Sequence, residues 1–157
     1  MIYSFTHYWS NRTWLGCECD GLSGRDLGYC AGKQFSAKIS PGDQIFIVTV
    51  LNGILFVCCK IKVSSVCNAA KAAKVLNVNK SELYAFDQPD VMYALAENSS
   101  PMFFRRCMST DDAKRLRLIG GSSISSLKIN SGLIDRQTLR SARRISDDSV
   151  RIFDKYV

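Results

Sequence analysis

Aromatic rings are the side chains of this sequence best suited to recognising a ligand, and they gather in its first 35 residues. A ring that stacks on a nucleobase contributes roughly 1–3 kcal/mol. Rings that only fill a core explain such a run equally well. We assign Tyr3 and Phe5 to the core. We expect five other side chains to line a base pocket, namely His7, Tyr8, Trp9, Trp14 and Tyr29.

Positively charged side chains form a second candidate set. The net charge of +7 favours a polyanionic partner. Residues 1–100 carry a net charge of +1 and residues 101–157 carry +6, so the positive field lies mainly in the last third of the chain. Arginine predominates there, and its planar guanidinium suits phosphate. The expected contacts to backbone phosphates and base edges are Arg12, Arg25, Lys33, Arg105, Arg106, Arg136, Arg140, Arg143 and Arg144.

Catalytic chemistry has little support in the residue types and their spacing. His7 is the only histidine, and a lone histidine in a strand is more often a structural residue than a base. No phosphate-binding loop, dinucleotide-binding motif or nucleophile motif is present. We therefore expect no catalytic residue and no cofactor. A small hydrolase or nuclease stays open as an alternative, which would need Glu18, Asp26 and Lys33 beside His7.

The cysteines raise the question of a zinc site. Cys17, Cys19, Cys30 and His7 are four potential ligands. Structural zinc usually takes two matched pairs of ligands two to four residues apart. Cys30 and the distant His7 do not form such a pair, so we expect no metal, although zinc binding by these four residues stays open.

The cellular compartment is predicted from what the sequence lacks. The seven cysteines are odd in number, which does not suggest a disulfide framework. No secretory signal is visible, and the longest apolar run, residues 45–59, is interrupted and too short to span a bilayer. We expect a cytoplasmic protein that makes no membrane contact.

The elements that must position these side chains indicate one α+β domain over residues 1–157. Residues 2–9 alternate as a strand, and residues 11–33 lack any sustained period and predict a long surface loop. The apolar runs 44–51 and 54–63 flank Asn52-Gly53 and predict a β-hairpin. Because its arms are apolar at nearly every position, we expect both faces of the hairpin to be covered.

The second half of the chain predicts a series of shorter elements. We expect a helix capped by Ser64 or Ser65 that ends near residue 76, strands over 91–96 and 102–108, and a helix from Ser109 to about residue 119. A serine-rich loop follows to residue 126. Two short helices close the chain, one starting at Asp135 and one at Ser146. If the helix from Asp135 continues through residue 144, it places Arg136, Arg140 and either Arg143 or Arg144 on one face.

Several short motifs together resemble the PUA-like superfamily, in particular its EVE/YTH-like branch. They are Tyr8-Trp9, Trp14, the strand entry Pro41-Gly42-Asp43-Gln44-Ile45-Phe46, residues 53–57 and Pro101-Met102-Phe103-Phe104. The Pro-Gly-Asp entry also occurs in related ASCH-type domains. The resemblance implies a small mixed β-barrel with peripheral helices and a pocket that receives a flipped or modified base, with Trp9 and Trp14 as its walls.

These observations lead to one expected function and two alternatives. We expect a non-catalytic module that binds nucleic acid, with DNA favoured over RNA, and recognises a methylated or hydroxymethylated flipped base. Such a module could serve as the recognition part of a restriction or defence system with a separate nuclease partner. An ASCH-like hydrolase or ribonuclease and a protein-interaction module are the alternatives.

Overall fold

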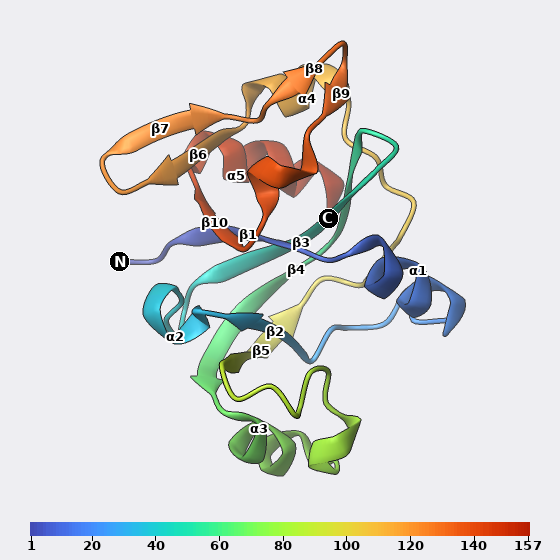
Figure 1. Ribbon diagram of the computed structural model, residues 1–157, viewed down its shortest axis with the longest axis vertical. Helices are drawn as coiled ribbons and strands as arrows, with labels where there is room; N and C mark the ends of the chain where they lie inside the picture. The colour runs from blue at the N-terminus through green and yellow to red at the C-terminus, as the bar shows by residue number, and fades with distance from the viewer.

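The predicted hairpin forms the centre of the molecule. In the computed structural model, which describes residues 1–157, strand β3 (Gln44–Leu51) pairs with β4 (Ile54–Cys67). The connecting residues Asn52 and Gly53 have φ angles of +51° and +76°, as the tight primed turn requires. β4 is longer than predicted and runs diagonally through the molecule (Figure 1).

The fold is α+β, as predicted, and contains one large mixed sheet. Its eight strands lie in the order β2-β5-β4-β3-β1-β10-β6-β7. β1 (Ser4–Tyr8) is parallel to β3 and antiparallel to β10. The other strands are β2 (Tyr29–Lys33), β5 (Val91–Ser99), β6 (Arg117–Gly120), β7 (Ser123–Ser126) and β10 (Ala142–Ile145), with β8 (Ile129–Asn130) and β9 (Leu133–Ile134) forming a separate pair.

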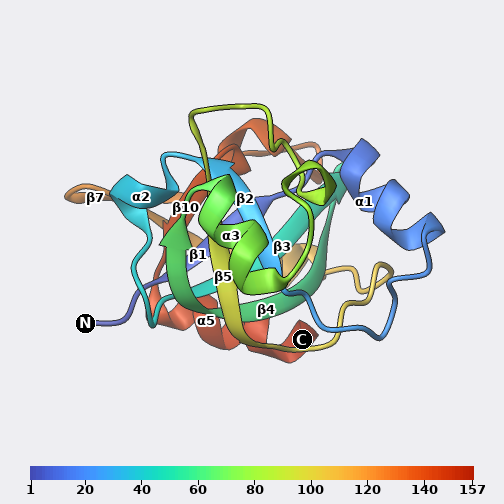
Figure 2. The ribbon, with the colours of Figure 1, turned by 90° about the horizontal axis from the view of Figure 1, so that it is seen from below.

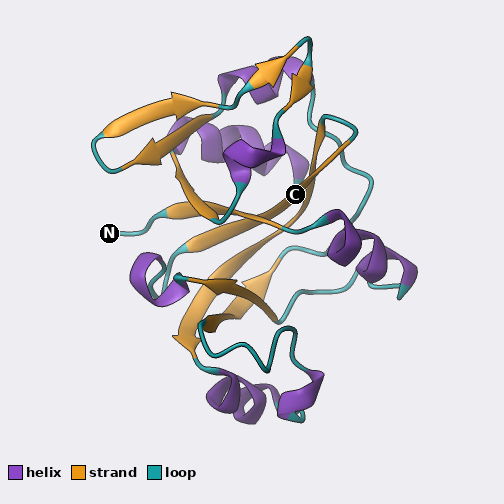
Figure 3. Cartoon of the chain, in the orientation of Figure 1, coloured by secondary structure: helices purple, strands orange, loops and turns teal.

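The helices lie around this sheet (Figure 3). They are α1 (Asn11–Cys19), α2 (Phe35–Lys38), α3 (Ala69–Leu76), α4 (Thr110–Arg115) and α5 (Asp147–Phe153), with 3₁₀ turns η1 (Lys80–Glu82), η2 (Arg136–Leu139) and η3 (Asp154–Tyr156). Figure 2 shows α3 in front of β5 at one end of the sheet. No helix is both long enough and apolar enough to cross a membrane.

Both faces of β3 are buried, as the apolar hairpin arms predict. Ile45 and Ile47 belong to a first core, which also contains Phe5 and Trp14. Phe46 belongs to a second core on the opposite face, which α4 and α5 help to cover. Phe5 therefore lies in the core as expected, whereas Tyr3 is only partly buried and packs against the first core.

The prediction of a loop over residues 11–33 is wrong. Ser10 caps α1 by accepting a hydrogen bond from the Thr13 N–H at 3.2 Å, and the end of the segment forms β2, which pairs with β5. α1 buries only Trp14 fully, so it has no sustained apolar period for a sequence pattern to detect. Its stability comes from tertiary packing.

Four elements in the second half also differ from the predictions. β4 continues through Ser64 and Ser65 because it pairs with β5, and Asn68 caps α3 instead. Residues 102–108 form no strand, apart from an isolated bridge between Phe56 and Cys107. The helix capped by Ser109 ends at Arg115. Residues 117–120 then pair with residues 123–126 as β6 and β7, although residues 123–126 were predicted to lie in a loop.

The chain closes with one helix and not two. Asp135 caps only the 3₁₀ turn η2, and residues 142–145 then form β10 between β1 and β6. Arg136, Arg140, Arg143 and Arg144 therefore do not form a stripe on one helix. The predicted helix at Ser146 is confirmed as α5, whose first turn contains Asp147 and Asp148.

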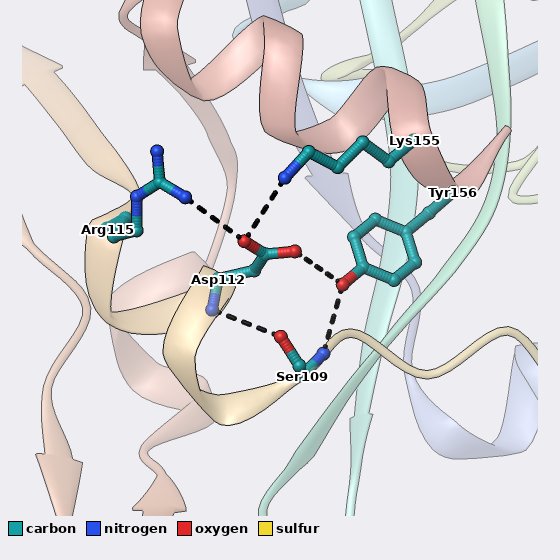
Figure 4. A network of polar contacts seen from close by, with 5 residues as sticks. All are labelled: Ser109, Asp112, Arg115, Lys155 and Tyr156. Atoms are coloured by element: carbon teal, nitrogen blue, oxygen red, sulfur yellow. Dashed lines mark hydrogen bonds and ion pairs between the residues drawn. The ribbon is translucent and has the colours of Figure 1, made fainter.

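A polar cluster fastens the end of the chain to α4 (Figure 4). The Tyr156 hydroxyl donates to Asp112 Oδ2 at 2.7 Å and accepts from the Ser109 N–H at 3.2 Å. Lys155 Nζ lies 3.4 Å and an Arg115 nitrogen 3.5 Å from Asp112 Oδ1. The hydrogen bond from Tyr156, followed by the Lys155 and Arg115 charges, holds the pKa of Asp112 below its ordinary value.

Candidate aromatic pocket

A cavity of about 420 Å³ opens between the end of β1, α1, β2 and the loop that precedes β5. This volume lies in the range of roughly 300–1,000 Å³ that is typical of small-ligand sites. Nine of its twelve lining residues are hydrophobic, so the cavity is mainly apolar. It is lined by His7, Tyr8, Trp9, Ser10, Thr13, Cys17, Leu22, Leu27, Tyr29, Cys30, Ala31 and Tyr84. We call this cavity the aromatic pocket.

The end of β1 places three of the predicted pocket residues. His7 and Tyr8 are the last residues of the strand, and Trp9 follows it directly. The Trp9 N–H donates to the Val48 carbonyl at 2.9 Å, and the Thr49 hydroxyl donates to the Trp9 carbonyl at 2.7 Å. Both backbone groups of Trp9 are therefore hydrogen-bonded to β3. The half-buried ring of Trp9 borders the pocket.

β2 supplies the facing wall, although it is far from β1 in the sheet. β2 is an edge strand and β1 lies four places away in the strand order. Tyr29, Cys30 and Ala31 of β2 nevertheless line the same cavity as His7 of β1. The sheet must therefore curl so that these two strands approach each other across the first core. No ladder joins β2 to β1, so the curled sheet stays open at this place.

His7 contributes an uncharged ring at neutral pH. Its side chain is buried, and burial lowers the pKa of the imidazole from 6.5 to about 4, against the opposing effect of a backbone hydrogen bond with Ala31. The imidazole makes an edge contact with Phe35, with 5.0 Å between ring centroids. Its Nδ1 atom is buried without a hydrogen-bond partner. Such an atom costs free energy until a partner satisfies it.

The thiols of the pocket are also uncharged. Burial, followed by the proximity of Cys58 and Asp20, raises the pKa of Cys17 above 9.0. Burial raises the pKa of Cys30 as well. No Asp, Glu, Lys or Arg lines the cavity. The pocket can therefore take a neutral, flat group and hold it by stacking and by a few hydrogen bonds.

Tyr84 is a pocket residue that the sequence did not reveal. It lies in the loop between η1 and β5 and has 60% of its surface exposed, at the rim of the cavity. Its N–H donates to the Tyr29 hydroxyl at 3.0 Å, and its carbonyl accepts from the Tyr93 hydroxyl. Two tyrosines of the sheet thus fix the loop. No periodic or motif signal marks Tyr84, because its position depends on these long-range contacts.

Trp14 does not line the pocket, which corrects the base pocket predicted above. Its side chain is fully buried in the first core. Its indole N–H donates to the Phe104 carbonyl at 3.3 Å, and its ring meets the Phe104 ring edge-on at 5.4 Å between centroids. Of the five predicted pocket residues, the structure brings together His7, Tyr8, Trp9 and Tyr29.

The predicted phosphate contacts are spread over the molecule. Lys33 forms an ion pair with Asp90 at 3.3 Å, and Arg105 pairs with Glu18 at 2.6 Å. Arg106 donates to the carbonyls of Cys58 and Pro101 and lies over the Phe103 ring, so its guanidinium is occupied within the fold. The four predicted residues that are exposed and form no ion pair are Arg12, Arg25, Arg136 and Arg140.

The ligand sets for zinc and for hydrolysis do not converge. His7, Cys17 and Cys30 all border the aromatic pocket, but the exposed Cys19 does not. No three His, Cys, Asp or Glu side chains lie close enough together to hold a metal ion. Glu18, Asp26 and Lys33, which a hydrolase would place beside His7, also do not line the pocket.

Comparison of the chain with models of protein families, with curated proteins and with solved structures finds no match.

Proposed function

We propose that this protein is a non-catalytic nucleic-acid-binding module that accepts a flipped nucleobase in the aromatic pocket. One observation carries this proposal. His7, Tyr8, Trp9, Tyr29 and Tyr84, which come from β1, β2 and a distant loop, converge on one apolar cavity without a formal charge. A nucleobase is flat, uncharged and able to stack, so it has the chemistry that this lining favours.

The energetics of the pocket are adequate for base flipping. Extruding a base from a duplex costs a few kcal/mol, and stacking on each suitable ring returns roughly 1–3 kcal/mol. Four rings of the lining keep part of their surface exposed and are therefore available for stacking, namely Tyr8, Trp9, Tyr29 and Tyr84. The imidazole of His7 can satisfy a polar atom on the base edge without introducing a charge.

The selectivity that we propose is for a base with an added methyl or hydroxymethyl group. The apolar residues Leu22, Leu27 and Ala31 line the cavity together with the aromatic rings. Burial of one added methyl group in such surroundings is worth roughly 0.8 kcal/mol. A modified base is therefore expected to bind several-fold more tightly than its unmodified counterpart.

The PUA-like resemblance belongs to the same proposal. The approach of β2 to β1 across the first core supports a barrel-like architecture. We further propose that the natural partner is DNA rather than RNA, and that the module acts with a separate nuclease in a restriction or defence system in the cytoplasm. The net charge of +7 supports a nucleic-acid partner of either kind.

The test is a comparison of binding between matched oligonucleotides and matched variants. Fluorescence anisotropy at one fixed salt concentration is measured for DNA duplexes, and for the corresponding RNA, with one unmodified, methylated or hydroxymethylated cytosine. We expect a modified DNA duplex to bind most tightly. Trp9→Ala should weaken that binding roughly 5- to 150-fold, the equivalent of losing 1–3 kcal/mol of stacking.

Phe86→Ala is the matched control, because Phe86 is a partly exposed ring in the same loop as Tyr84 but does not line the pocket. This variant should bind the oligonucleotides with the same affinity as the protein without a substitution. Circular dichroism confirms that each variant is folded. Equal affinity for all oligonucleotides, together with unchanged binding by Trp9→Ala, would refute the proposed function.

A further inference from the structure

A second cavity, of about 430 Å³, lies beside β1 on the side of β10 and α2. It differs from the aromatic pocket in its charge. Lys38, Arg143 and Arg144 line it, and no Asp or Glu does. We call it the basic groove. The remainder of its lining comes from Tyr3 and Phe5 of the N-terminal segment and from residues 119–121, 141 and 142.

The cations of the basic groove have no acidic partner. The structure contains seven ion pairs, and none of them involves Lys38, Arg143 or Arg144. A chain with 14 Asp and Glu residues thus leaves three basic residues unpaired around one cavity. Like charges gathered in a concave site attract an anion more strongly than isolated surface charges do.

Arg144 is held in place without consuming its hydrogen-bond donors. Its guanidinium carbon lies 3.7 Å from the centre of the Tyr3 ring, a cation–π contact that fixes the plane of the group. Its side chain donates to no other group of the protein. A planar guanidinium that is fixed and still unpaired suits two-point binding of phosphate oxygens.

Lys38 is positioned from a different element. It lies in the last turn of α2, and its ammonium group donates to the Ala142 carbonyl at 3.5 Å. This long hydrogen bond leaves two further donors of the ammonium group without a partner. β10 and α2 therefore contribute cations to the basic groove from separate parts of the chain.

The basic groove and the aromatic pocket are neighbours along β1. Phe5 and His7 alternate along β1 and point to the same side of it, and Tyr3 directly precedes the strand. Tyr3 and Phe5 line the groove, and His7 lines the pocket. At about 3.3 Å per residue, Tyr3 and His7 are separated by roughly 13 Å along the strand. Ala142 of the groove lies directly opposite His7 in the β1–β10 ladder.

We propose that the basic groove binds a phosphate group of the nucleic-acid backbone that flanks the nucleotide whose base occupies the aromatic pocket. The assignment to a flanking nucleotide rests on the function proposed above. The affinity of the groove for a phosphodiester is independent of that function. Backbone contacts of this kind fix the register of a nucleic acid on its protein and carry no sequence information.

The salt dependence of oligonucleotide binding tests this proposal in the chain of residues 1–157. Neutralising one phosphate contact reduces the slope of log K against log salt concentration by about 1. We expect Arg144→Ala and Lys38→Ala each to reduce the slope by about 1, with an unchanged preference for the modified base. Arg144→Lys keeps the charge and should retain the slope. Trp9→Ala should lose the base preference at an unchanged slope.

Arg151→Ala is the charge-matched control, because Arg151 is exposed on α5, pairs with Asp148 and does not line the groove. This variant should leave the slope unchanged. If Arg144→Ala and Lys38→Ala both keep the full slope while Trp9→Ala still weakens binding, the basic groove is not a phosphate site and the pocket function stands. If the slope falls in both variants but no oligonucleotide shows a base preference, the groove proposal stands and the pocket function fails.

Discussion

At the scale of single residues, His7 is a buried side chain whose pKa is lowered by its surroundings. A folded pKa of about 4 against 6.5 in the unfolded chain means that the folded state binds fewer protons between these pH values. The contribution of His7 to stability is therefore complete above pH 6.5 and is lost as the pH decreases towards 4. The neutral imidazole is also the form that is available to a ligand at physiological pH.

We predict that His7 lowers the free energy of unfolding by up to about 3 kcal/mol between pH 6.5 and pH 4, at 1.36 kcal/mol per pKa unit. Denaturant unfolding at several pH values measures this loss, and His7→Gln should make it smaller. Because His7 is the only histidine, one imidazole NMR signal reports its pKa without ambiguity. A midpoint near 6.5 would contradict the prediction.

The two tryptophans show what the sequence can and cannot predict about single residues. The aromatic run predicts a pocket position for both. Trp9 follows a strand that the alternating pattern identifies, and the structure places it at the cavity. Trp14 lies on α1, which has no apolar period, so the direction of its side chain was not predictable. Its burial depends on Phe104, 90 residues away.

At the scale of elements, the sequence predicts a helix or strand correctly where its local pattern is strong. The Asn52-Gly53 turn and its apolar arms predicted the central hairpin, because the turn geometry and the burial pattern are both local. β2 and β10 were missed, since each is a short strand that forms only by pairing with distant segments. Tyr84, the one pocket ring that the sequence did not identify, is placed by hydrogen bonds to Tyr29 and Tyr93, which no local pattern marks.

We predict that the cluster around Asp112 makes the end of the chain sensitive to acid. The pKa of Asp112 is depressed, so its contribution to stability is complete above the ordinary carboxyl pKa of 3.8 and is lost as the pH falls through the folded value. Tyr156→Phe removes the largest cause and should raise the pKa of Asp112, as a carboxyl ¹³C NMR titration measures. Tyr84→Phe, which removes a hydroxyl far from the cluster, serves as its control, and an equal pKa in both variants would disprove this role of Tyr156.

At the scale of the whole molecule, the sheet separates two cores that share β3. Ile45 and Ile47 face the first core, and Phe46 and Val48 face the second. β1 pairs with Gln44–Val48 and β4 pairs with the whole of β3, so residues 44–48 have a strand on each side. β7 is the opposite case, since it is an edge strand and all four of its residues are exposed.

We predict that amide hydrogen exchange follows this arrangement. The amides of residues 44–48 in β3 should exchange only through global unfolding, because both faces and both edges of this part of the strand are covered. The β7 amides should exchange much faster, through local opening. Exchange monitored by NMR gives a rate for each amide, and similar protection of the two strands would show that the sheet opens as a single unit.

The position of β1 also has a consequence for the synthesis of the protein. β1 is made before the other strands of the sheet, but one of its two neighbours, β10, comes about 140 residues later, as the hydrogen bond from Thr6 to the Arg143 carbonyl shows. Until that segment leaves the ribosome, β1 keeps one unpaired edge, and the face of β3 that carries Phe46 and Val48 lacks the cover of α5. The growing chain therefore exposes an open strand edge and an apolar surface for most of its translation, which are the features that chaperones recognise.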